Sequence, residues 1–319
     1  MDKEERIAYL SKAVYQNSTF TYSGPKFLYK YRPFDKYSFD MLEKEYLYLC
    51  PASDLDDETE CDTSINLTDI YELETNNLKR YCLEKIIQQI KPHCSDETYE
   101  SIRNKIYSIT LRNGIVRRHF LTDLAIEIQK EVPDHNIYPL INGIANLPNK
   151  LDDPSMRPRL EKLVEVAMNA KSAVGICSLT ENNDIEYMWE KYAADYSGYC
   201  IEYDVSDYEE FRDLVPVIYD AKRDKSIIMA IVCTFIGFLI NRFSDNQIMA
   251  DTSQYVRLFV SKYPEWEYQN EWRIIGKGKG HIKAPKIKKI FIGKNASSEN
   301  IAKLTTFCEE HNIEVIRNG

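Results

Sequence analysis

The chain lacks the excess of basic residues that nucleic-acid-binding proteins usually spread over their surface. Its 319 residues include 50 Asp and Glu against 41 Lys and Arg, which gives a net charge of −9. A global basic field is therefore excluded, whereas a local basic patch is not. A hydrophobic fraction of 44% and a charged fraction of 29% are typical of a soluble globular protein with one large or two ordinary domains.

Zinc-ligand spacing is also absent. No Cys-x-x-Cys pair occurs, and the eight cysteines stand alone at Cys50, Cys61, Cys82, Cys94, Cys177, Cys200, Cys233 and Cys308. The five histidines form no triad pattern, although a Cys–His pair that meets only in the folded chain stays open. We therefore expect reduced thiols and no metal site. The charged residues 1–6 offer no apolar core of a signal peptide, so we expect a cytoplasmic protein.

One apolar run needs an explanation. Residues 227–240 are nearly all apolar. As a helix they would extend only about 20 Å, which is shorter than the roughly 20 residues that span a bilayer. We expect a helix buried on most sides and no stable membrane insertion. The alternative is a helix that docks a partner or lies against a membrane.

Strand patterns occupy both ends of the chain, and helical patterns fill the middle. Alternating or apolar runs predict strands at 27–31, 46–50, 173–180, 199–204, 214–219, 271–275, 287–293 and 313–316. Outside the middle, helices are predicted at 2–16, 37–44, 184–196, 251–262 and 298–311. We expect an α+β core built from 1–62 and 173–319, with one sheet joining both ends. A helical insertion at 63–172 splits this core.

Two short motifs stand at the ends of predicted strands. Lys30, Tyr31 and Arg32 end the first strand, and an arginine fork suits a phosphate or pyrophosphate. Ser178 and Thr180 end a later strand and share one face, so their hydroxyls would border one ribose site. The alternatives are a surface arginine near a turn and a strand end that begins a turn.

A third motif, Gln269-Asn270-Glu271, opens an apolar strand. If the strand includes all three residues, Gln269 and Glu271 point to the same side. Glu271 would then be an oriented carboxylate and Gln269 its neighbour. The alternative is that Glu271 is an ion-pair partner of Arg273 or of a nearby lysine.

In this order, the motifs resemble the Arg, Ser and Glu layout of one branch of the ADP-ribosyltransferases. The resemblance implies a mixed, mostly antiparallel ADP-ribosyltransferase-like sheet core, with NAD as substrate. Breaking the nicotinamide–ribose bond passes through an oxocarbenium-like transition state, as glycoside cleavage does. Glu271 would stabilise that charge and Arg32 would hold the phosphates. Gln269 would assist the acceptor, which is an unknown protein or nucleic acid.

The sequence is also similar to the bacterial family catalogued as domain of unknown function 2971. The similar segments are LYKYR (28–32), LYLCPASDLDDETE (47–60), ICSLTENNDIEYMWEKYAADYSGYCIEYD (176–204), VIYD (217–220), WEYQNEWRII (266–275) and IKKIFIGKNAS (287–297). Relatives often carry His-Tyr-Thr where this chain has Lys30-Tyr31-Arg32, which leaves open whether Lys30 or Arg32 anchors the phosphates. They tend to carry Asn-Asp-Pro where this chain has Asp56-Asp57-Glu58.

Two further features have open alternatives. Trp189 and Tyr192 lie at helical spacing and would either pack on the sheet or stack on nicotinamide or adenine. The acidic residues 54–60 suggest a solvated loop, although three clustered carboxylates also suit a divalent metal.

We thus expect an NAD-dependent ADP-ribosyltransferase or NAD glycohydrolase. By resemblance, such an enzyme would act as a bacterial toxin or anti-phage defence effector. The alternatives are a non-enzymatic binding module of such a system, which would hold a partner through 227–240 or the same cleft, and a metal-dependent nuclease that uses the 54–60 carboxylates with Glu271.

Overall fold

A computed structural model describes residues 1–15, 20–55, 60–61, 65–113, 118–133, 137–208, 213–220, 228–233, 236 and 253–317. Its contacts divide the chain into two compact units. Unit 1 contains residues 1–62, 170–222 and 259–319, and unit 2 contains 63–169 and 223–258. The predicted boundary at residue 62 is also a boundary of these units, whereas residues 223–258 were predicted to belong to the α+β core.

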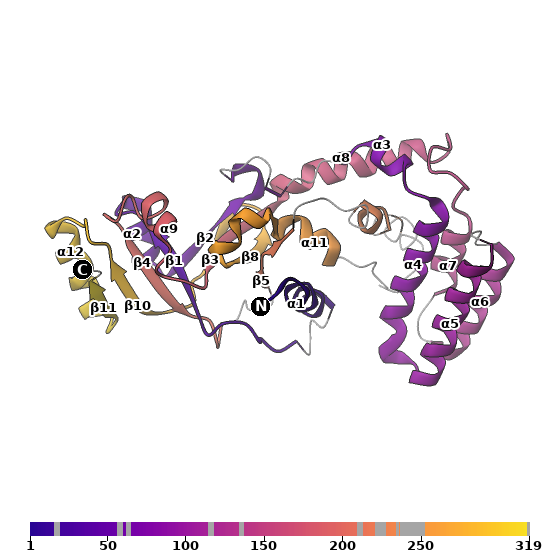
Figure 1. Cartoon of the computed structure of the whole chain (residues 1–319), viewed down its shortest axis with the longest axis horizontal. Coiled ribbons are helices and arrows are strands. Elements are labelled where there is room, and N and C mark those ends of the chain that lie inside the picture. Colours follow the sequence, from indigo (N-terminus) through magenta and orange to yellow (C-terminus); the bar gives the residue numbers. More distant parts are fainter. Residues whose placement is uncertain are drawn as a thin grey trace. The chain divides into compact units, whose positions relative to one another are not determined.

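Unit 2 is helical in its described residues. Its helices α4 to α7 contact one another and bury the apolar side of each (Figure 1). The elements are α3 (Leu67–Tyr71), α4 (Thr75–Ile90), the 3-10 turn η2 (Lys91–His93), α5 (Asp96–Asn113), α6 (Arg118–Glu131), α7 (Tyr138–Ala145), most of α8 (Arg157–Ala173) and most of α11 (Ser253–Val260). The expected helical character of this region is therefore present.

The apolar run 227–240 is described only in part. Residues 228–233 and 236 are helical, and Ala230, Ile231, Val232, Cys233 and Ile236 are buried. The described part agrees with the expected buried helix, and the other residues of the run lie outside the described residues. No helix in the described ranges is both long and apolar enough to cross a membrane.

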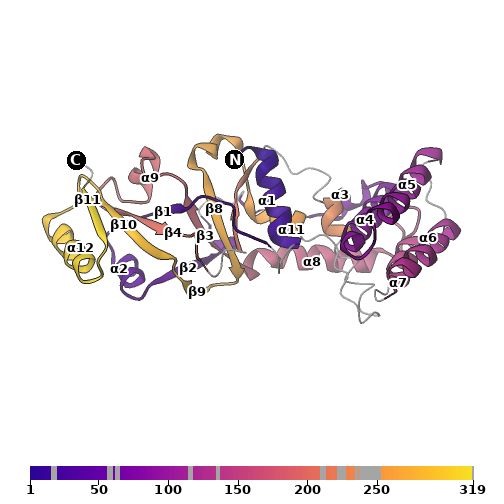
Figure 2. The same ribbon diagram turned by 90° about the horizontal axis from the view of Figure 1, so that it is seen from below.

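Unit 1 is built on a branched sheet of nine described strands. The strand order is β11-β10-β4-β1-β3-β2-β9, and β8 pairs with both β3 and β5 (Figure 2). All pairs are antiparallel except β10 with β11. The strands are β1 (Phe27–Arg32), β2 (Tyr46–Pro51), β3 (Val174–Thr180), β4 (Tyr199–Asp204), β5 (Leu214–Pro216), β8 (Glu271–Lys277), β9 (Gly280–Lys283), β10 (Lys286–Ile292) and β11 (Glu314–Arg317). The expected α+β class with a mixed, mostly antiparallel sheet is confirmed.

Helices and turns complete unit 1. Asp35 and Ser297 cap the first turns of α2 and α12 with their side-chain oxygens. The elements are α1 (Lys3–Tyr15), α2 (Lys36–Glu43), η1 (Ala52–Asp54), α9 (Glu186–Lys191), η4 (Pro264–Gln269) and α12 (Ser298–Glu310), with a small parallel ribbon of β6 (Ile218–Tyr219) and β7 (Ser261–Lys262).

Three predicted elements differ from the structure. The predicted helix 184–196 is only α9, because Ala194, Asp195 and Tyr196 take left-handed backbone angles that stack the Tyr196 ring on Trp189 at 5.6 Å. The predicted strand 214–219 breaks at Val217, whose N–H donates to the carbonyl of Glu271. The predicted helix 251–262 ends at Val260, after which β7 begins; residues 251–252 lie outside the described residues.

Gly198 fixes the approach of β1 to the turn before β4. A Cβ atom at this position would lie 2.2 Å from the carbonyl oxygen of Arg32 and 2.8 Å from that of Ala193. Both are backbone carbonyl oxygens, which cannot move away without disturbing the packing around them. We therefore expect Gly198→Ala to lower the free energy of unfolding by about 3 kcal/mol.

Gly280→Ala is the matched control, because a Cβ at Gly280 meets no atom within 4 Å. We expect it to change the free energy of unfolding by less than about 1 kcal/mol. Denaturant unfolding followed by tryptophan fluorescence measures both, since Trp189, Trp266 and Trp272 all belong to unit 1. Equal effects of the two variants would contradict the packing argument.

Candidate active site

A cavity opens where two strands share one edge of β3. On that edge, β1 pairs at Tyr29–Thr180 and β2 pairs at Cys50–Ile176, so β1 and β2 diverge between these points. The cavity has a volume of about 330 Å³ and is lined by β1, β2, β3, α9 and η4 together with Glu60 and Lys262. All its lining residues belong to unit 1.

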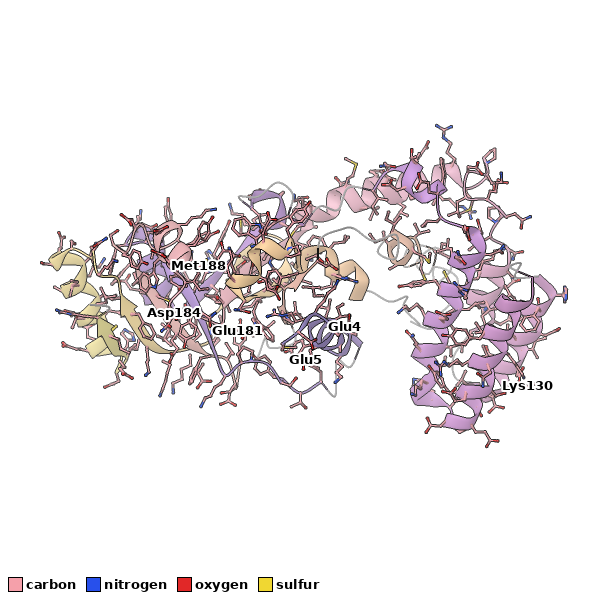
Figure 3. The ribbon with its side chains drawn as sticks, in the orientation of Figure 1. Glu4, Glu5, Lys130, Glu181, Asp184 and Met188 are labelled. Atoms are coloured by element: carbon pink, nitrogen blue, oxygen red, sulfur yellow. The ribbon has the colours of Figure 1, made fainter. Side chains whose placement is uncertain are left out.

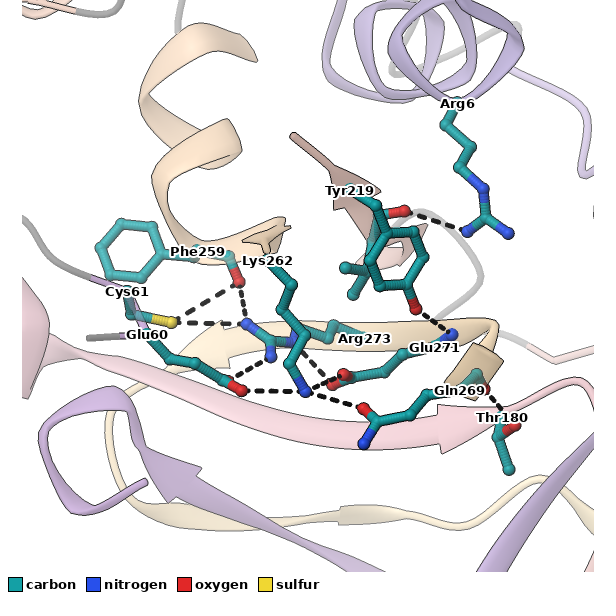
Figure 4. A network of polar contacts seen from close by, with 11 residues as sticks. Arg6, Glu60, Cys61, Thr180, Tyr219, Phe259, Lys262, Gln269, Glu271 and Arg273 are labelled. Carbon is teal, nitrogen blue, oxygen red and sulfur yellow. Dashed lines mark hydrogen bonds and ion pairs between the residues drawn. The ribbon is translucent and has the colours of Figure 1, made fainter. Parts of the chain in front are cut away.

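Four charged side chains form a closed ring at this cavity (Figure 4). Glu271 and Arg273 are buried, and the side chains of Lys262 and Glu60 are 9% and 12% exposed. Lys262 Nζ lies 2.8 Å from a carboxylate oxygen of Glu271 and 2.8 Å from one of Glu60. Arg273 donates from Nε to the other oxygen of Glu271 at 2.8 Å, and from Nη2 to the other oxygen of Glu60 at 2.6 Å. Charges of opposite sign therefore alternate around the ring, which has no net charge.

Local backbone structure places the ring. Glu271 opens β8 directly after Asn270, whose left-handed angle (φ 42°) turns the chain out of η4. Asparagine tolerates this conformation better than most residues. The N–H of Glu271 donates to the hydroxyl of Tyr219 at 2.7 Å, and Tyr219 pairs with Lys262 across the β6–β7 ribbon. The β6–β7 ribbon thus positions both Lys262, which pairs with the Glu271 carboxylate, and the backbone N–H of Glu271.

Helix α1 supports the same turn from the other side. Arg6 is buried and donates to the carbonyl of Val217 at 3.0 Å and to the side-chain oxygen of Asn270 at 3.4 Å. Its guanidinium also lies over the Tyr219 ring, 5.5 Å from the ring centre. The segment before Glu271 is therefore fixed by contacts from two elements.

The ring keeps Glu271 ionised. Burial by itself would raise the pKa of the Glu271 carboxyl, but the attraction of Arg273 and Lys262 and the hydrogen bonds that they donate hold this pKa at about 2. The carboxylate oxygens still have lone pairs beyond the two that Arg273 and Lys262 occupy. Because Glu271 lines the cavity, a ligand there meets an ionised carboxylate held within a ring that has no net charge.

The cations of the ring are equally well held. Burial opposes the charge on Lys262, but Glu271 and Glu60 outweigh it and raise the Lys262 pKa above its ordinary value. Arg273 is 1% exposed in its side chain, and it also donates to the carbonyl of Phe259 at 2.7 Å and lies 3.4 Å from the sulfur of Cys61. The expected alternative, an ion pair of Glu271 with Arg273 or a nearby lysine, is confirmed with both partners.

Lys30 and Arg32 bring positive charge to the cavity from β1. Lys30 Nζ donates to the carbonyl of Ser178 at 2.6 Å, across the gap where β1 leaves β3. Enclosure by protein lowers the pKa of the Lys30 ammonium. Arg32 is half-buried, and one of its terminal nitrogens lies 3.5 Å from the sulfur of Met41. Both side chains line the cavity, so their donors are placed to meet an anionic ligand.

The hydroxyls of Ser178 and Thr180 were predicted to border one ribose site, but the Thr180 hydroxyl is engaged by the backbone. Ser178 and Thr180 both line the cavity, and they stand opposite Arg273 and Glu271 in the β3–β8 register. Thr180 is 1% exposed, and its hydroxyl donates to the carbonyl of Gln269 at 2.5 Å and accepts from the N–H of Asn182. The Thr180 side chain therefore holds the turn, as in the alternative for this motif.

The geometry assumed for Gln269 is wrong. Gln269 is the last residue of η4, not part of a strand, and the left-handed Asn270 separates it from β8. Its side chain nevertheless reaches the ring, because its Oε1 accepts from Lys262 Nζ at 2.8 Å. Lys262 thus connects the side chains of Gln269 and Glu271. The sequence-based prediction had placed these two side chains together through strand alternation alone.

Of the predicted aromatic residues, Tyr31 and Trp189 form the core and Tyr192 faces the cavity. Trp189 is 2% exposed, is not among the cavity-lining residues, and packs edge-to-face on Tyr31 at 5.2 Å. Of the two roles left open for Trp189, the structure shows packing in the core of unit 1. Tyr31 lines the cavity, and its hydroxyl holds the 182–185 turn, whereas Tyr192 is 36% exposed.

An aromatic rim borders the same cavity. Tyr187 and Trp266 line it, with ring centres 5.8 Å apart, and Tyr268 lies about equally close to both. Tyr187 lies between Asp184 and Met188, which Figure 3 labels together with Glu181 beside the sheet. The rings of Tyr187 and Trp266 therefore line the same cavity as the cations Lys30 and Arg32.

Glu60 and Lys262 were not predicted as residues of an NAD site, and Glu60 was grouped with Glu271 only in the nuclease alternative. Glu60 was only the last carboxylate of the acidic loop, and Lys262 was the last residue of an expected helix. No spacing in the sequence relates them to each other or to Glu271. In the described residues no group of three or more His, Cys, Asp or Glu side chains is arranged to hold a metal ion, while residues 56–59 of the acidic loop lie outside the described residues.

Residues 188–274 match the model of a family described as protein of unknown function (DUF2971). This part of the chain is similar to that family. The matched segment includes Lys262, Gln269, Glu271 and Arg273 but neither β1 nor Glu60. Neither a comparison with curated proteins nor one with solved structures gives a match. The DUF2971 resemblance therefore covers the part of the site around Glu271 and assigns it no activity.

Proposed function

We propose that this cavity binds NAD and that the protein cleaves the nicotinamide–ribose bond, either transferring ADP-ribose to an acceptor or releasing it to water. One observation carries the proposal: Glu271, held ionised, lines the same cavity as Lys30 and Arg32. An oxocarbenium-forming reaction on an anionic dinucleotide needs both a fixed negative charge and a phosphate anchor.

The roles follow from the charges. Lys30 and Arg32 would hold the pyrophosphate, and Glu271 would face the ribose. The bond from ribose C1 to nicotinamide nitrogen breaks, its electron pair leaves with nicotinamide, and the positive charge that develops on the ribose is stabilised by Glu271. A lone pair of water or of the acceptor then forms the new bond at C1, and the proton of that group is released.

The remaining groups would position the ligands. The rings of Tyr187, Tyr192 and Trp266 offer stacking surfaces for nicotinamide or adenine. Gln269, oriented by Lys262, would contact the acceptor. The cavity volume of about 330 Å³ is near the lower end for ligand sites, so it suits one half of the dinucleotide, with the other half on the rim. The resemblance to ADP-ribosyltransferases extends the proposal to a toxin or defence effector.

The direct test measures nicotinamide release from NAD by the wild-type protein, Glu271→Gln and Arg32→Ala. We expect Glu271→Gln to reduce the rate by about 100-fold, because the stabilising charge is lost. We expect Arg32→Ala to weaken NAD binding by about 10-fold, because a charge-assisted contact is lost. Calorimetry measures that binding. A Glu271→Gln protein that releases nicotinamide at the wild-type rate would refute the mechanism.

Glu202→Gln controls for general destabilisation. Glu202 is a buried carboxylate on β4 that accepts from the hydroxyl of Tyr29 at 2.8 Å, and it does not line the cavity. We expect this variant to keep nicotinamide release even if it unfolds more easily. Equal losses of release in Glu202→Gln and Glu271→Gln would mean that only folding is affected.

One observation favours a second candidate, a site that binds a nucleotide without cleaving it. Both carboxylate oxygens of Glu271 already accept from Lys262 and Arg273, as in a purely structural ion network. In that case calorimetry would detect NAD binding that depends on Arg32, while nicotinamide release would be absent with cell extract supplied as a source of acceptors.

A further inference from the structure

A lysine-rich segment separates Glu271 from the C-terminal helix. No Asp or Glu occurs between Glu271 and Glu299, although the chain carries a net charge of −9. The interval contains the lysines Lys277, Lys279, Lys283, Lys286, Lys288, Lys289 and Lys294. This is the local basic patch that the overall composition left open.

The structure exposes most of this charge. The side chains of Lys277, Lys279, Lys283, Lys286 and Lys288 are exposed along β8, β9 and β10. Among the described residues, the ion pair within this segment is that of Lys289 with Glu314 at 3.2 Å. The exposed lysines are therefore available to an anionic partner. When no such partner is bound, the positive charges of this segment repel one another.

Aromatic rings lie among these lysines on β2 and β9. Tyr46 pairs with Lys283 and Tyr48 with His281 in the β2–β9 register, so the four side chains share one face. The rings of Tyr46 and His281 stack at 4.1 Å with an angle of 27°, and Tyr48 meets His281 at 5.9 Å. The opposite face of β2 carries Leu47 and Leu49, which are buried. We call the face of Tyr46, Tyr48, His281 and Lys283 the β2–β9 face.

The β2–β9 face continues into the cavity. Tyr48 and Cys50 stand on the same side of β2 as Tyr46, and both line the cavity. The carboxylate of Asp40 beside this face is engaged, since it accepts from the Tyr46 hydroxyl at 2.7 Å and pairs with Lys44 at 2.6 Å. A chain lying on this face would thus lead from the lysines over the stacked rings to the cavity wall.

We propose that the β2–β9 face, with Lys277 and Lys279, binds single-stranded nucleic acid. Phosphates would pair with the exposed lysines, and unpaired bases would stack on the Tyr46–His281–Tyr48 rings. Stacked rings favour nucleic acid over an acidic lipid surface or an acidic peptide, since neither of these offers a π-face. The binding needs no NAD chemistry, so it is tested separately from the proposed reaction.

Fluorescence anisotropy with a labelled 20-nucleotide oligo-dT and an unstructured RNA, without NAD, tests the proposal. We expect a dissociation constant in the micromolar range at 50 mM salt. If four lysines contact phosphates, the logarithm of the binding constant should fall with the logarithm of the salt concentration with a slope of about −3. A duplex of matched length binds more weakly, because its bases are already stacked. Lys279→Glu/Lys283→Glu weakens oligonucleotide binding at least 10-fold, and His281→Ala about 5- to 10-fold.

Lys12→Glu/Lys150→Glu is the matched control. Both lysines are exposed and lie outside the β2–β9 face, Lys12 on α1 and Lys150 between α7 and α8, and the two substitutions change the net charge by the same amount. We expect this variant to bind like the wild type. Equal weakening in the two double variants, or absence of binding at 50 mM salt, overturns the proposal. Equal binding of polyglutamate, or binding confined to acidic phospholipid vesicles, overturns the assignment to nucleic acid.

Discussion

Arg273→Met should lower the free energy of unfolding of unit 1 by about 3 to 5 kcal/mol, because it leaves buried carboxylates without one of their two cations. The substitution keeps an apolar side chain in the space but removes the donors to Glu271, Glu60 and the carbonyl of Phe259. Both carboxylates then share the single cation Lys262. Urea unfolding followed by tryptophan fluorescence measures the loss, since every tryptophan of the chain belongs to unit 1.

A double-mutant cycle separates this ring effect from lost packing. Arg273→Met/Glu271→Gln removes one cation and one anion together, so we expect it to lose less stability than the sum of the two single variants, by about 1 to 3 kcal/mol. Lys289→Met breaks the exposed pair with Glu314 and should cost at most about 1 kcal/mol. An Arg273→Met protein whose stability stays within about 1 kcal/mol of wild type would contradict the structural role of the ring.

Acid should destabilise the wild-type protein through Glu271 in a defined window. The carboxyl pKa is about 2 in the folded chain against an ordinary value of 4.5. Between these values the unfolded chain binds a proton that the folded chain does not, so stability rises with pH across the window. This group therefore contributes about 3 kcal/mol above pH 4.5, and the contribution is lost as the pH falls toward 2.

The measurement compares unfolding free energies of wild type and Glu271→Gln from about pH 6 to about pH 2. The variant has no carboxyl to protonate at this position, so the difference between the two proteins should shrink by about 3 kcal/mol across the window. Glu299→Gln removes an exposed carboxylate in the first turn of α12 and controls for the change in net charge. Parallel curves for wild type and Glu271→Gln would show that the pKa of Glu271 is not lowered.

Most elements of unit 1 follow from local patterns. β4 has its predicted bounds, Tyr199 and Asp204, and the bounds of β1, β2 and β3 agree with the prediction within one residue. β9 was not predicted, because Gly280–Lys283 has a single apolar side chain, Ile282, and is a strand only through its pairing with β2. The Ala194–Tyr196 turn was also missed, since no glycine marks its left-handed angles.

The ion ring of the site was predictable only where its residues lie close in sequence. Glu271 and Arg273 stand two apart on β8, and their pairing was one of the expected alternatives. Glu60 and Lys262 complete the ring from elements that only the fold brings near β8, and a lone glutamate and a lone lysine have no pattern. Gln269 was predicted to reach the site from a strand. Its side chain does reach Lys262, but from the 3-10 turn η4.

The shared edge of β3 has a consequence for synthesis of the chain. β1 and β2 leave the ribosome first, but their partner on that edge, β3, is made only after residues 63–173, and β8, which covers the other edge, follows later still. Until β3 has emerged, β1 and β2 lack the strand that they share, and the other edge of β2 stays unpaired until β9 is made. Glu60 lacks its full set of cations until residue 273 has emerged. Nascent chains arrested before β8 should therefore be protease-sensitive in residues 20–55, and those arrested beyond residue 317 protected.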